Sequence, residues 1–499
     1  NAIQEYPQLQ ADINPMALSQ VFTFWTTLSP KSVFKDILEL APGHYMHISS
    51  EKTEIKQWWQ LHFPADGLPG YRGSFNEARE ELSALLTDAV KLRLRADVPV
   101  AAYLSGGLDS SATTALIKNV ASGSLRTFSI GFEDDEFDET SFQQEASAYL
   151  KTRHTPFTCK KDDIGYYFPQ VIWHSEIPIL RTAPVPMFCL SKKVRENNIK
   201  VVITGEGADE MLAGYDIFKE TIIRNFWSRQ PHSKYRPLLL NKLYPYLAQF
   251  KGRNQAMLKL FYGYKLEETS SPFYSHLLRW KNTSNIISYF SGDMHAAING
   301  HDSIKEAGKL LHKDFNTWNK LSQAQWLEIT IFMSGYLLCS QGDRMAMANS
   351  VEGRYPFLDY RVMEFAATLP PDYKMHGLDE KYILKQMMQG QLPDSILKRP
   401  KQAYRAPVSK SFMTEKPPAY VEEMIAPEAL KKTGLFNIEK TQKLLSKIKT
   451  SQLVSEMDNM ALSGILSTQL LHSQFINKNA TFSLPTQLSN CHRIIDQRT

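Results

Sequence analysis

Between residues 74 and 210, short apolar runs alternate with segments whose apolar positions recur at helical spacing. The apolar runs have the length of buried strands, and the segments between them are predicted to be helices. This alternation predicts an α/β fold with a doubly wound parallel sheet, covered by helices on both faces. The predicted strands are residues 98–104, 125–132, 154–159 and the apolar start of 200–210, and the predicted helices are 74–95, 110–121 and 139–152, followed by a helix-rich stretch to residue 199.

The pattern changes on both sides of this region. Residues 13–28 have helical spacing, residues 43–61 form two short runs around a polar turn, and residues 63–74 are rich in proline and glycine. We therefore expect a helix, a hairpin and a linker before the sheet. Residues 215–350 and 360–470 are mostly helical in pattern, so large helical additions are expected, while the tail from Asn477 shows no clear periodicity.

Composition narrows the class of protein. A chain of 499 residues is too long for one ordinary core, so two or three structural units are expected. The net charge of +5 is a mild bias that does not indicate nucleic-acid binding. Four widely spaced cysteines imply neither a zinc motif nor a disulfide framework, which fits a cytoplasmic location. The longest apolar stretch, residues 329–339, is too short to span a membrane and is predicted to be a buried helix.

The segment Tyr103–Ser111, with the sequence YLSGGLDSS, joins the first predicted strand of the sheet to a helix. Backbone N–H groups at such a helix N-terminus form an anion site, to which Ser105, Ser110 and Ser111 add hydroxyl donors. No phosphate-loop lysine is present, so we predict that Asp109 binds Mg²⁺ and that Mg²⁺ binds the phosphates. The alternative is a glycine-rich turn in which Asp109 only caps the helix.

A second polar turn, TGEGADE at residues 204–210, follows the fourth predicted strand. In a parallel sheet, ligands bind at the carboxyl ends of the strands, where both turns are expected to lie. Asp209 could supply a second carboxylate to the metal. Glu206 lies between two glycines, which let the backbone approach a ligand closely. The alternative is an acidic surface loop.

Five motifs together carry a family resemblance: LSGGLDSS (104–111), GEGADE (205–210), DRMAMANSVEGRYPFLD (343–359), KYILK (381–385) and RPKQAYRAP (399–407). As a set, they resemble the synthetase domain of the asparagine synthetase family, which belongs to the adenylating ATP pyrophosphatases of HUP-like fold. The resemblance runs from about residue 15 to about residue 470. It implies an ATP-dependent ligase that converts a carboxylate to an acyl-adenylate and then, with ammonia, to an amide. Similar enzymes include β-lactam synthetases and amidotransferases of antibiotic pathways.

The resemblance also implies roles for single residues. Glu206 takes the place of the family's catalytic glutamate, and Lys401 that of its lysine near the transferred group. Asp109 and Asp209 would hold the metal. Asp343 and Arg354 could equally be structural ion-pair partners. The residues expected to bind ATP and pyrophosphate are Leu104, Ser105, Gly106, Gly107, Asp109, Ser110, Ser111, Ile130, Thr204 and Gly205, with Arg344 and Lys381 as additional anion contacts.

The front of the chain departs from the family pattern. Complete members begin with a glutaminase domain whose nucleophile is an N-terminal cysteine, whereas this chain begins with Asn1 and its first cysteine is Cys159. Residues 1–63 resemble only the end of that domain. The expected division is a glutaminase remnant with linker at 1–73, a synthetase domain at 74–470 and a tail at 471–499. Nitrogen would come from ammonia, or from glutamine through a missing glutaminase domain.

We therefore expect an enzyme that uses ATP and Mg²⁺ to amidate an acid, with aspartate as the favoured substrate. The nearest alternative is the same chemistry on another acid: a malonate-type acid, a carrier-bound acyl group or a β-lactam closure. A non-catalytic nucleotide-binding scaffold and an RNA-thiolating pyrophosphatase are alternatives of other classes. No nucleic acid or membrane partner is expected, and a homodimer is one assembly consistent with the resemblance.

Overall fold

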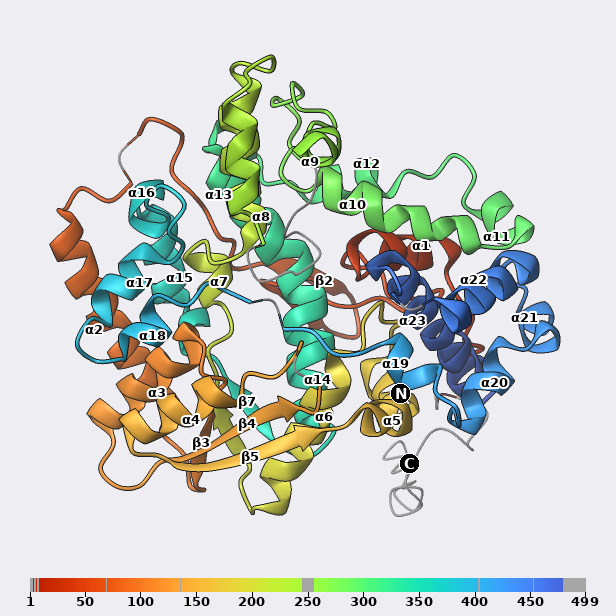
Figure 1. Cartoon of the computed structure of the whole chain (residues 1–499), viewed down its shortest axis with the longest axis horizontal. Coiled ribbons are helices and arrows are strands. Elements are labelled where there is room, and N and C mark those ends of the chain that lie inside the picture. The colour runs from red at the N-terminus through yellow and green to blue at the C-terminus, as the bar shows by residue number, and fades with distance from the viewer. Residues whose placement is uncertain are drawn as a thin grey trace.

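The computed structural model describes residues 9–478, apart from residues 69, 135, 245–254, 403 and 452, together with residues 3 and 6. Its central element is a five-stranded sheet of order β5-β4-β3-β6-β7, in which every neighbouring pair is parallel (Figure 1). The predicted doubly wound parallel sheet is thereby confirmed. Its strands are β3 (Val100–Tyr103), β4 (Arg126–Phe132), β5 (Arg153–Cys159), β6 (Val201–Ile203) and β7 (Glu352–Arg354).

Helices cover both faces of the sheet. On one face, α2 (Phe75–Arg93), α3 (Leu108–Val120) and α4 (Thr140–Leu150) share a core with Ala102 and Ile203 of the strands. On the other face, α6 (Pro184–Glu196) and α14 (Arg344–Met347) share a core with Ala101, Phe128 and Val202. Because both faces are covered, the inner strands β3, β4 and β6 are largely buried and rich in apolar residues, whereas the edge strand β5 is more exposed and more polar.

The edge strand β7 was not predicted. It is three residues long, reads Glu-Gly-Arg, and pairs Val201 with Glu352 and Ile203 with Arg354 in parallel register. Such a short polar segment carries no local strand signal. Its position in the sheet depends on the intervening helices, since about 150 residues separate it from β6.

The order of the strands places a crevice at a defined point. The chain leaves β3 toward β4 and β5 on one side, and β6 lies on the other side of β3. In open α/β sheets, ligands bind at such a switch point, beyond the carboxyl ends of the strands. The turns that follow β3 and β6, which contain the two polar motifs, are therefore neighbours at this edge.

The segments before the sheet match their predictions. The helix α1 (Pro15–Phe24) is capped by the Asn14 side chain, and β1 (His44–Ile48) and β2 (Thr53–Gln57) form the antiparallel hairpin. The amphipathic helix α2 begins with a capping box, in which Glu77 accepts the Ser74 backbone N–H at 2.7 Å.

A π-helix, Glu328–Asp343, continues directly into α14, and we call this continuous element the central helix. It runs down the middle of the molecule in Figure 1, ending at the label α14. It contains the predicted buried helix, since Ile329, Ile331, Met333 and Tyr336 are buried. Among the described residues, no helix is both long and apolar enough to cross a membrane.

The remaining helices pack around this core. The last helix, α23 (Glu456–Leu471), continues as a π-helix to Ile476, beyond the predicted domain boundary at 470. The tail from residue 479 lies outside the described residues. The other helices are α5 (Lys161–Ser175), α7 (Ala208–Met211), α8 (Asp216–Ser228), α9 (Gln255–Tyr262), α10 (Leu277–Ser284), α11 (Gly292–Ala297), α12 (Ser303–Ala307), α13 (Lys320–Leu327), α15 (Tyr360–Thr368), α16 (Pro371–Lys374), α17 (Tyr382–Met387), α18 (Asp394–Leu397), α19 (Ser409–Phe412), α20 (Ala419–Ile425), α21 (Pro427–Thr433) and α22 (Ile438–Thr450).

Candidate active site

Four charged side chains meet beyond the carboxyl ends of β3 and β6, and we call them the charge cluster: Asp109, Asp209, Lys381 and Lys401. The Lys381 ammonium donates to both carboxylate oxygens of Asp109, at 2.7 and 2.9 Å, and to Asp209 at 2.8 Å. The Lys401 Nζ lies 2.6 Å from Asp209 and 3.5 Å from Asp109. Two carboxylates and two ammonium groups thus share one site.

The charge cluster favours the ionised forms of Lys381, Lys401 and Asp209. Burial lowers the pKa of both lysines, but the two aspartates outweigh it, so both ammonium pKa values are raised. Burial likewise raises the pKa of Asp209, but Lys381 and Lys401 outweigh it and hold that pKa well below its usual range. Burial and the Asp209 charge raise the pKa of Asp109. At neutral pH both ammonium groups therefore stay protonated, although the two aspartates balance much of their charge.

The turn after β3 is shaped to receive an anion. The hydroxyls of Ser105 and Ser110 are 3.0 Å apart, and the Ser105 backbone N–H donates to Ser110 at 3.1 Å. No side chain caps the N-terminus of α3 at Gly107, so its first N–H groups remain available to a ligand. The buried hydroxyl of Ser111 has no hydrogen-bond partner. The N–H groups at the start of α3, with the hydroxyls of Ser105 and Ser110, make this turn able to donate to an anion, and we call it the cradle.

Two glycines let the backbone pack closely around this cradle. Gly106 has a φ of +74°, and a Cβ there would lie 2.5 Å from the backbone carbon of Phe142. A Cβ on Gly205 would lie 2.9 Å from the backbone of Asp109 and Ser110. The turn after β6 is therefore in direct contact with the turn after β3, which only glycine permits.

Glu206 lies beside the charge cluster, and the pKa of its carboxyl is raised. Burial raises the pKa of its carboxyl to about 7, with a lowering effect from Lys401 and a raising one from Asp109. Its Oε2 is buried and has no hydrogen-bond partner. A buried acceptor without a donor costs about 1–3 kcal/mol, which a bound N–H donor would recover. A carboxylate with a pKa near 7 is suited to act as a general base at neutral pH.

A single cavity of about 750 Å³ connects these groups. It extends from the strand ends to the central helix, where Phe332 and Tyr336 line it. The predicted residues that line it are Leu104, Ser105, Gly107, Asp109, Ser110, Ile130, Thr204, Gly205, Glu206, Asp209, Lys381 and Lys401. The apolar side chains among them, together with Phe128 and Leu190, offer a surface on which a nucleobase can pack. The charge cluster forms the polar part of the cavity wall.

Three of the predicted site residues do not line the cavity: Gly106, Ser111 and Arg344. The first two lie in the turn after β3 and at the start of α3, next to residues that line it. Arg344 lies at the start of α14, where its guanidinium donates to the Ser175 carbonyl and lies 3.7 Å from the Glu176 carboxylate. These partners bind it outside the cavity.

The motif at residues 343–359 contains two further residues with expected roles, Arg354 and Asp343. Arg354 pairs with Glu352 at 2.7 Å and donates to the carbonyls of Arg93 and Arg95, joining β7 to the end of α2. Arg354 therefore forms a structural ion pair, and its partner is Glu352. Asp343 has a pKa raised by burial, against the lowering effect of Arg344.

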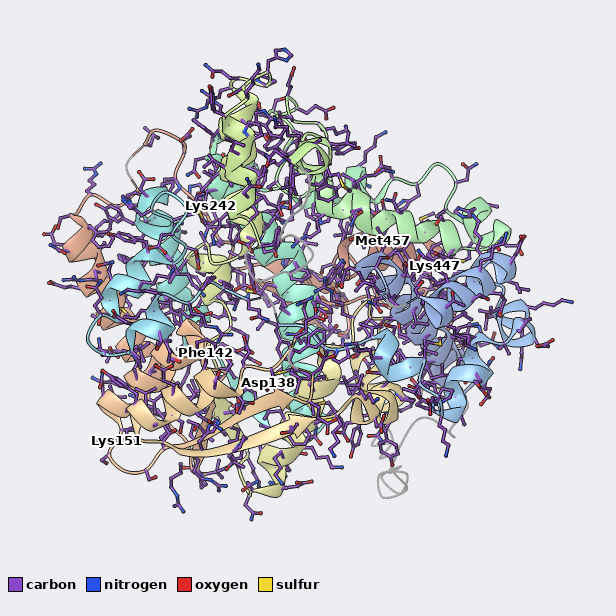
Figure 2. The ribbon with its side chains drawn as sticks, viewed as in Figure 1. Asp138, Phe142, Lys151, Lys242, Lys447 and Met457 are labelled. Atoms are coloured by element: carbon purple, nitrogen blue, oxygen red, sulfur yellow. The ribbon has the colours of Figure 1, made fainter. Side chains whose placement is uncertain are left out.

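Arg399 was not among the predicted site residues, yet it lines the cavity. Its guanidinium pairs with Glu139, donates to the Gly106 carbonyl at 3.5 Å and lies 4.0 Å from the ring centroid of Phe142. Phe142 is labelled on α4 in Figure 2. Arg399 therefore stabilises the turn after β3 from the distant segment that also carries Lys401. In the sequence, the only indication of this position was that Arg399 and Lys401 flank Pro400.

The residues present fit a divalent cation as well as phosphates. Mg²⁺ in proteins takes one or two carboxylates together with substrate phosphates, and Asp109 and Asp209 supply two carboxylates at the same point. Their oxygens are now held by two lysines, whose ammonium groups are equally suited to phosphate oxygens. The unpartnered hydroxyls of Ser111 and Thr204 supply further polar atoms at this edge.

Comparisons with known proteins agree with this geometry. The asparagine synthase family matches residues 81–473, and a glutamine amidotransferase domain family matches residues 1–59. The relatives include Amidase chyE of Penicillium rubens, 28% identical over 462 residues that cover 85% of this chain and 66% of the relative. The glutamine-hydrolyzing asparagine synthetase 1 of Bacillus subtilis is 26% identical over 401 residues, covering 80% of this chain and 60% of the relative. Amidase chry2 of Gibberella zeae is 26% identical over 405 residues, covering 75% and 59%.

This chain spans about three fifths to two thirds of the length of these relatives. Its match to the glutamine amidotransferase domain is confined to the hairpin and the segment before it. The match to asparagine synthase, by contrast, contains the whole parallel sheet, the charge cluster and Glu206. Because that match covers well over half of the sequence, the chain belongs to the asparagine synthase family.

Proposed function

We propose that this protein catalyses ATP-dependent amidation of a carboxylic acid through an acyl-adenylate. The observation that carries the proposal is the charge cluster at the carboxyl ends of β3 and β6, with Glu206 beside it. A site that presents two ammonium groups, two carboxylates and a base of pKa about 7 has the groups that phosphoryl transfer and amide formation each require.

In the first step, an oxygen of the acid attacks the α-phosphorus of ATP, and pyrophosphate leaves. Lys381 and Lys401 stabilise the charge on the transferring and leaving phosphate oxygens, while the serine hydroxyls and the α3 N-terminus hold pyrophosphate. Mg²⁺, bound by Asp109 and Asp209, would supply further positive charge to the phosphates.

In the second step, the nitrogen of ammonia attacks the acyl carbon, the C–N bond forms and AMP leaves. Glu206 accepts the proton that the attacking nitrogen loses, which fits its unpartnered buried oxygen. Ammonia is the attacking species whether it arrives free or is released from glutamine by a glutaminase domain. The names of the relatives, asparagine synthetase and amidase, are consistent with this chemistry.

We propose aspartate as the acid, following the resemblance and the Bacillus relative. A specific observation favours the alternative of a larger, less charged acid. The far end of the cavity is lined by Trp25, Phe332 and Tyr336. The arginines there are already paired, Arg181 with Glu456 at 2.7 Å and Arg279 with Glu328 at 3.0 Å. An aromatic wall with neutralised cations suits an apolar substituent better than a second carboxylate.

The test is to incubate the protein with ATP, Mg²⁺, ammonium and a panel of acids that includes aspartate, a malonate-type acid and aromatic acids. Acid-dependent formation of AMP and pyrophosphate would support adenylation and identify the acid. Formation of ADP and phosphate would contradict the acyl-adenylate. ATP binding without turnover of any acid would favour the non-catalytic scaffold.

Replacing Lys401 with alanine should lower turnover by about 10²–10³-fold, the usual cost of removing one donor to a developing oxyanion. Lys401 reaches the charge cluster from the loop after α18, and its ammonium is held 2.6 Å from Asp209. Because Lys381 and the serine hydroxyls remain, ATP affinity should change far less than kcat. Steady-state kinetics of pyrophosphate release would measure both.

Lys398 is the matched control three residues away. Its ammonium pairs with Asp394 at 2.6 Å, and both side chains are 76% exposed. An exposed pair of this kind contributes little, so Lys398→Ala should change turnover by less than about threefold. Equal and small effects of both substitutions would remove Lys401 from the catalytic machinery.

A further inference from the structure

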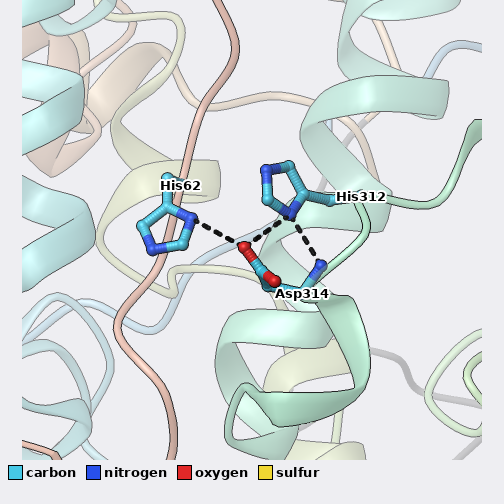
Figure 3. A group of neighbouring side chains, drawn as sticks. All are labelled: His62, His312 and Asp314. Carbon is cyan, nitrogen blue, oxygen red and sulfur yellow. Dashed lines mark hydrogen bonds and ion pairs between the residues drawn. The ribbon is translucent and has the colours of Figure 1, made fainter.

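Two histidines and an aspartate form a cluster outside the cavity: His62, His312 and Asp314 (Figure 3). One ligand atom from each residue lies within 4.8 Å of the other two. The Asp314 Oδ2 is 4.0 Å from the His62 Nδ1 and 3.8 Å from the His312 Nδ1. Figure 3 shows both rings turned toward this oxygen from opposite sides.

The separations in this cluster exceed those of a hydrogen bond. An N–H···O bond joins atoms about 2.7–3.2 Å apart, so a proton does not bridge Asp314 to either ring in this arrangement. Zinc with nitrogen and oxygen ligands at about 2.0–2.2 Å holds its donors about 3.4 Å apart in a tetrahedral site. The two nitrogen–oxygen separations exceed this spacing by about half an ångström.

The backbone around the cluster is already held in place on both sides. Leu61 and Phe63, on either side of His62, are buried in the core with Trp318. The Asp66 backbone N–H donates to the Thr317 carbonyl at 2.7 Å. The backbone that carries His62 is therefore attached to the segment 312–318, which carries the other two residues.

Within the cluster, one ring is fixed and the other is adaptable. The side chain of His312 is 7% exposed and its ring centroid lies 5.0 Å from that of Trp318. The side chain of His62 is 58% exposed, so its ring can turn toward an ion at little cost. The His312 Nδ1 accepts the Asp314 backbone N–H at 3.0 Å. A metal that takes this nitrogen displaces that N–H, which water then accepts.

We propose that His62, His312 and Asp314 bind one divalent transition-metal ion, with Zn²⁺ as the preferred ion and water completing its coordination. Two imidazoles and one carboxylate suit zinc and its neighbours, whereas Mg²⁺ prefers oxygen ligands alone. None of the three residues lines the cavity, so the ion is separate from any metal in the phosphate site.

The position of the site gives the ion a structural role. The glutamine amidotransferase match ends at residue 59 and the asparagine synthase match begins at residue 81, and His62 lies between them. His312 and Asp314 belong to the synthetase part. A bound ion therefore cross-links the connecting segment to the synthetase domain and stabilises this junction.

The test uses the full chain, purified without a polyhistidine tag and stripped of metal with a chelator. Titration with Zn²⁺ by calorimetry should show one site per chain. His62→Gln and Asp314→Asn should each weaken zinc binding by at least ~10–100-fold. Loss of a residue that only supports a metal ligand already has an effect of this size. Zinc should raise the midpoint of thermal unfolding of the wild type, because it binds only the folded arrangement.

His47→Gln is the matched control, because His47 is an exposed histidine on β1 and lies outside the cluster. It should bind zinc and gain thermal stability as the wild type does. His62→Gln should keep the wild-type circular dichroism spectrum, since its side chain is exposed, but lose the zinc-dependent rise. Absence of zinc binding in the wild type, or equal binding by His62→Gln, would overturn the proposal.

Discussion

Replacing Asp109 with asparagine should lower acid-dependent pyrophosphate release by about 10³-fold or more. The carboxylate of Asp109 accepts two hydrogen bonds from Lys381 and lies 3.5 Å from Lys401. Asparagine keeps the shape but removes the charge, so the site loses a ligand for the cation and the group that orients the Lys381 ammonium. Both losses act on the phosphates, where charge develops in the transition state.

The same substitution should also lower the free energy of unfolding. Loss of one partner from a buried ion cluster leaves charge uncompensated, which typically costs about 3–5 kcal/mol. Activity must therefore be measured on protein shown to be folded by circular dichroism at low temperature. Pyrophosphate release per folded molecule is the quantity that tests the role of Asp109.

Asp359→Asn is the matched control for this loss of stability. Asp359 is 6% exposed and accepts hydrogen bonds from Arg93 at 2.9 Å and Arg361 at 3.0 Å, but it does not line the cavity. Its substitution should destabilise the protein while leaving turnover per folded molecule within about threefold of wild type. Near-normal activity of Asp109→Asn, or equal losses in both variants, would contradict the role of Asp109 in phosphate chemistry.

Glu206→Gln should lower amide formation by about 10²–10⁴-fold, the usual contribution of a positioned general base. Glutamine is nearly isosteric but cannot accept the proton of the attacking nitrogen. Because adenylation precedes that proton transfer, the first turnover of pyrophosphate release should be affected much less. Single-turnover measurements of pyrophosphate and amide in the same sample would separate the two steps.

The pH dependence provides a second measurement for Glu206. Burial raises the pKa of its carboxyl to about 7, so the base is mostly protonated at pH 6 and mostly ionised at pH 8. The rate of amide formation, compared at constant concentration of unprotonated ammonia, should rise through about pH 7 and level off above about pH 8. This rise with pH, which we call the pH limb, should disappear in Glu206→Gln.

Glu210 offers the comparison within the same motif. It is buried and accepts the Tyr215 hydroxyl at 2.8 Å, and burial together with Asp209 raises the pKa of its carboxyl to about 8. Because Glu210 is largely protonated at neutral pH, Glu210→Gln should retain the pH limb. If the limb vanished in Glu210→Gln and persisted in Glu206→Gln, the base would be Glu210.

The sequence by itself determined the elements whose signals are local. The strands β3, β4 and β6 contain short apolar runs, and α2 has its capping box at Ser74. The turns after β3 and β6 carry glycines beside acidic and hydroxyl groups. Since parallel strands end at one edge of a sheet, the proximity of Asp109 and Asp209 also followed from the pattern. The set of motifs was specific enough to indicate the family.

The tertiary structure decided what depends on contacts between distant segments. Lys381 is 272 residues from Asp109, yet it forms the centre of the charge cluster. Arg344, expected at the same site from its motif, instead binds Ser175 and Glu176. β7 has no strand signal of its own and exists because β6 offers it an edge. Local periodicity indicates backbone conformation and burial. The partner of a charged side chain depends instead on the packing of the whole chain, because Coulomb energy and desolvation depend on distances that only the fold determines.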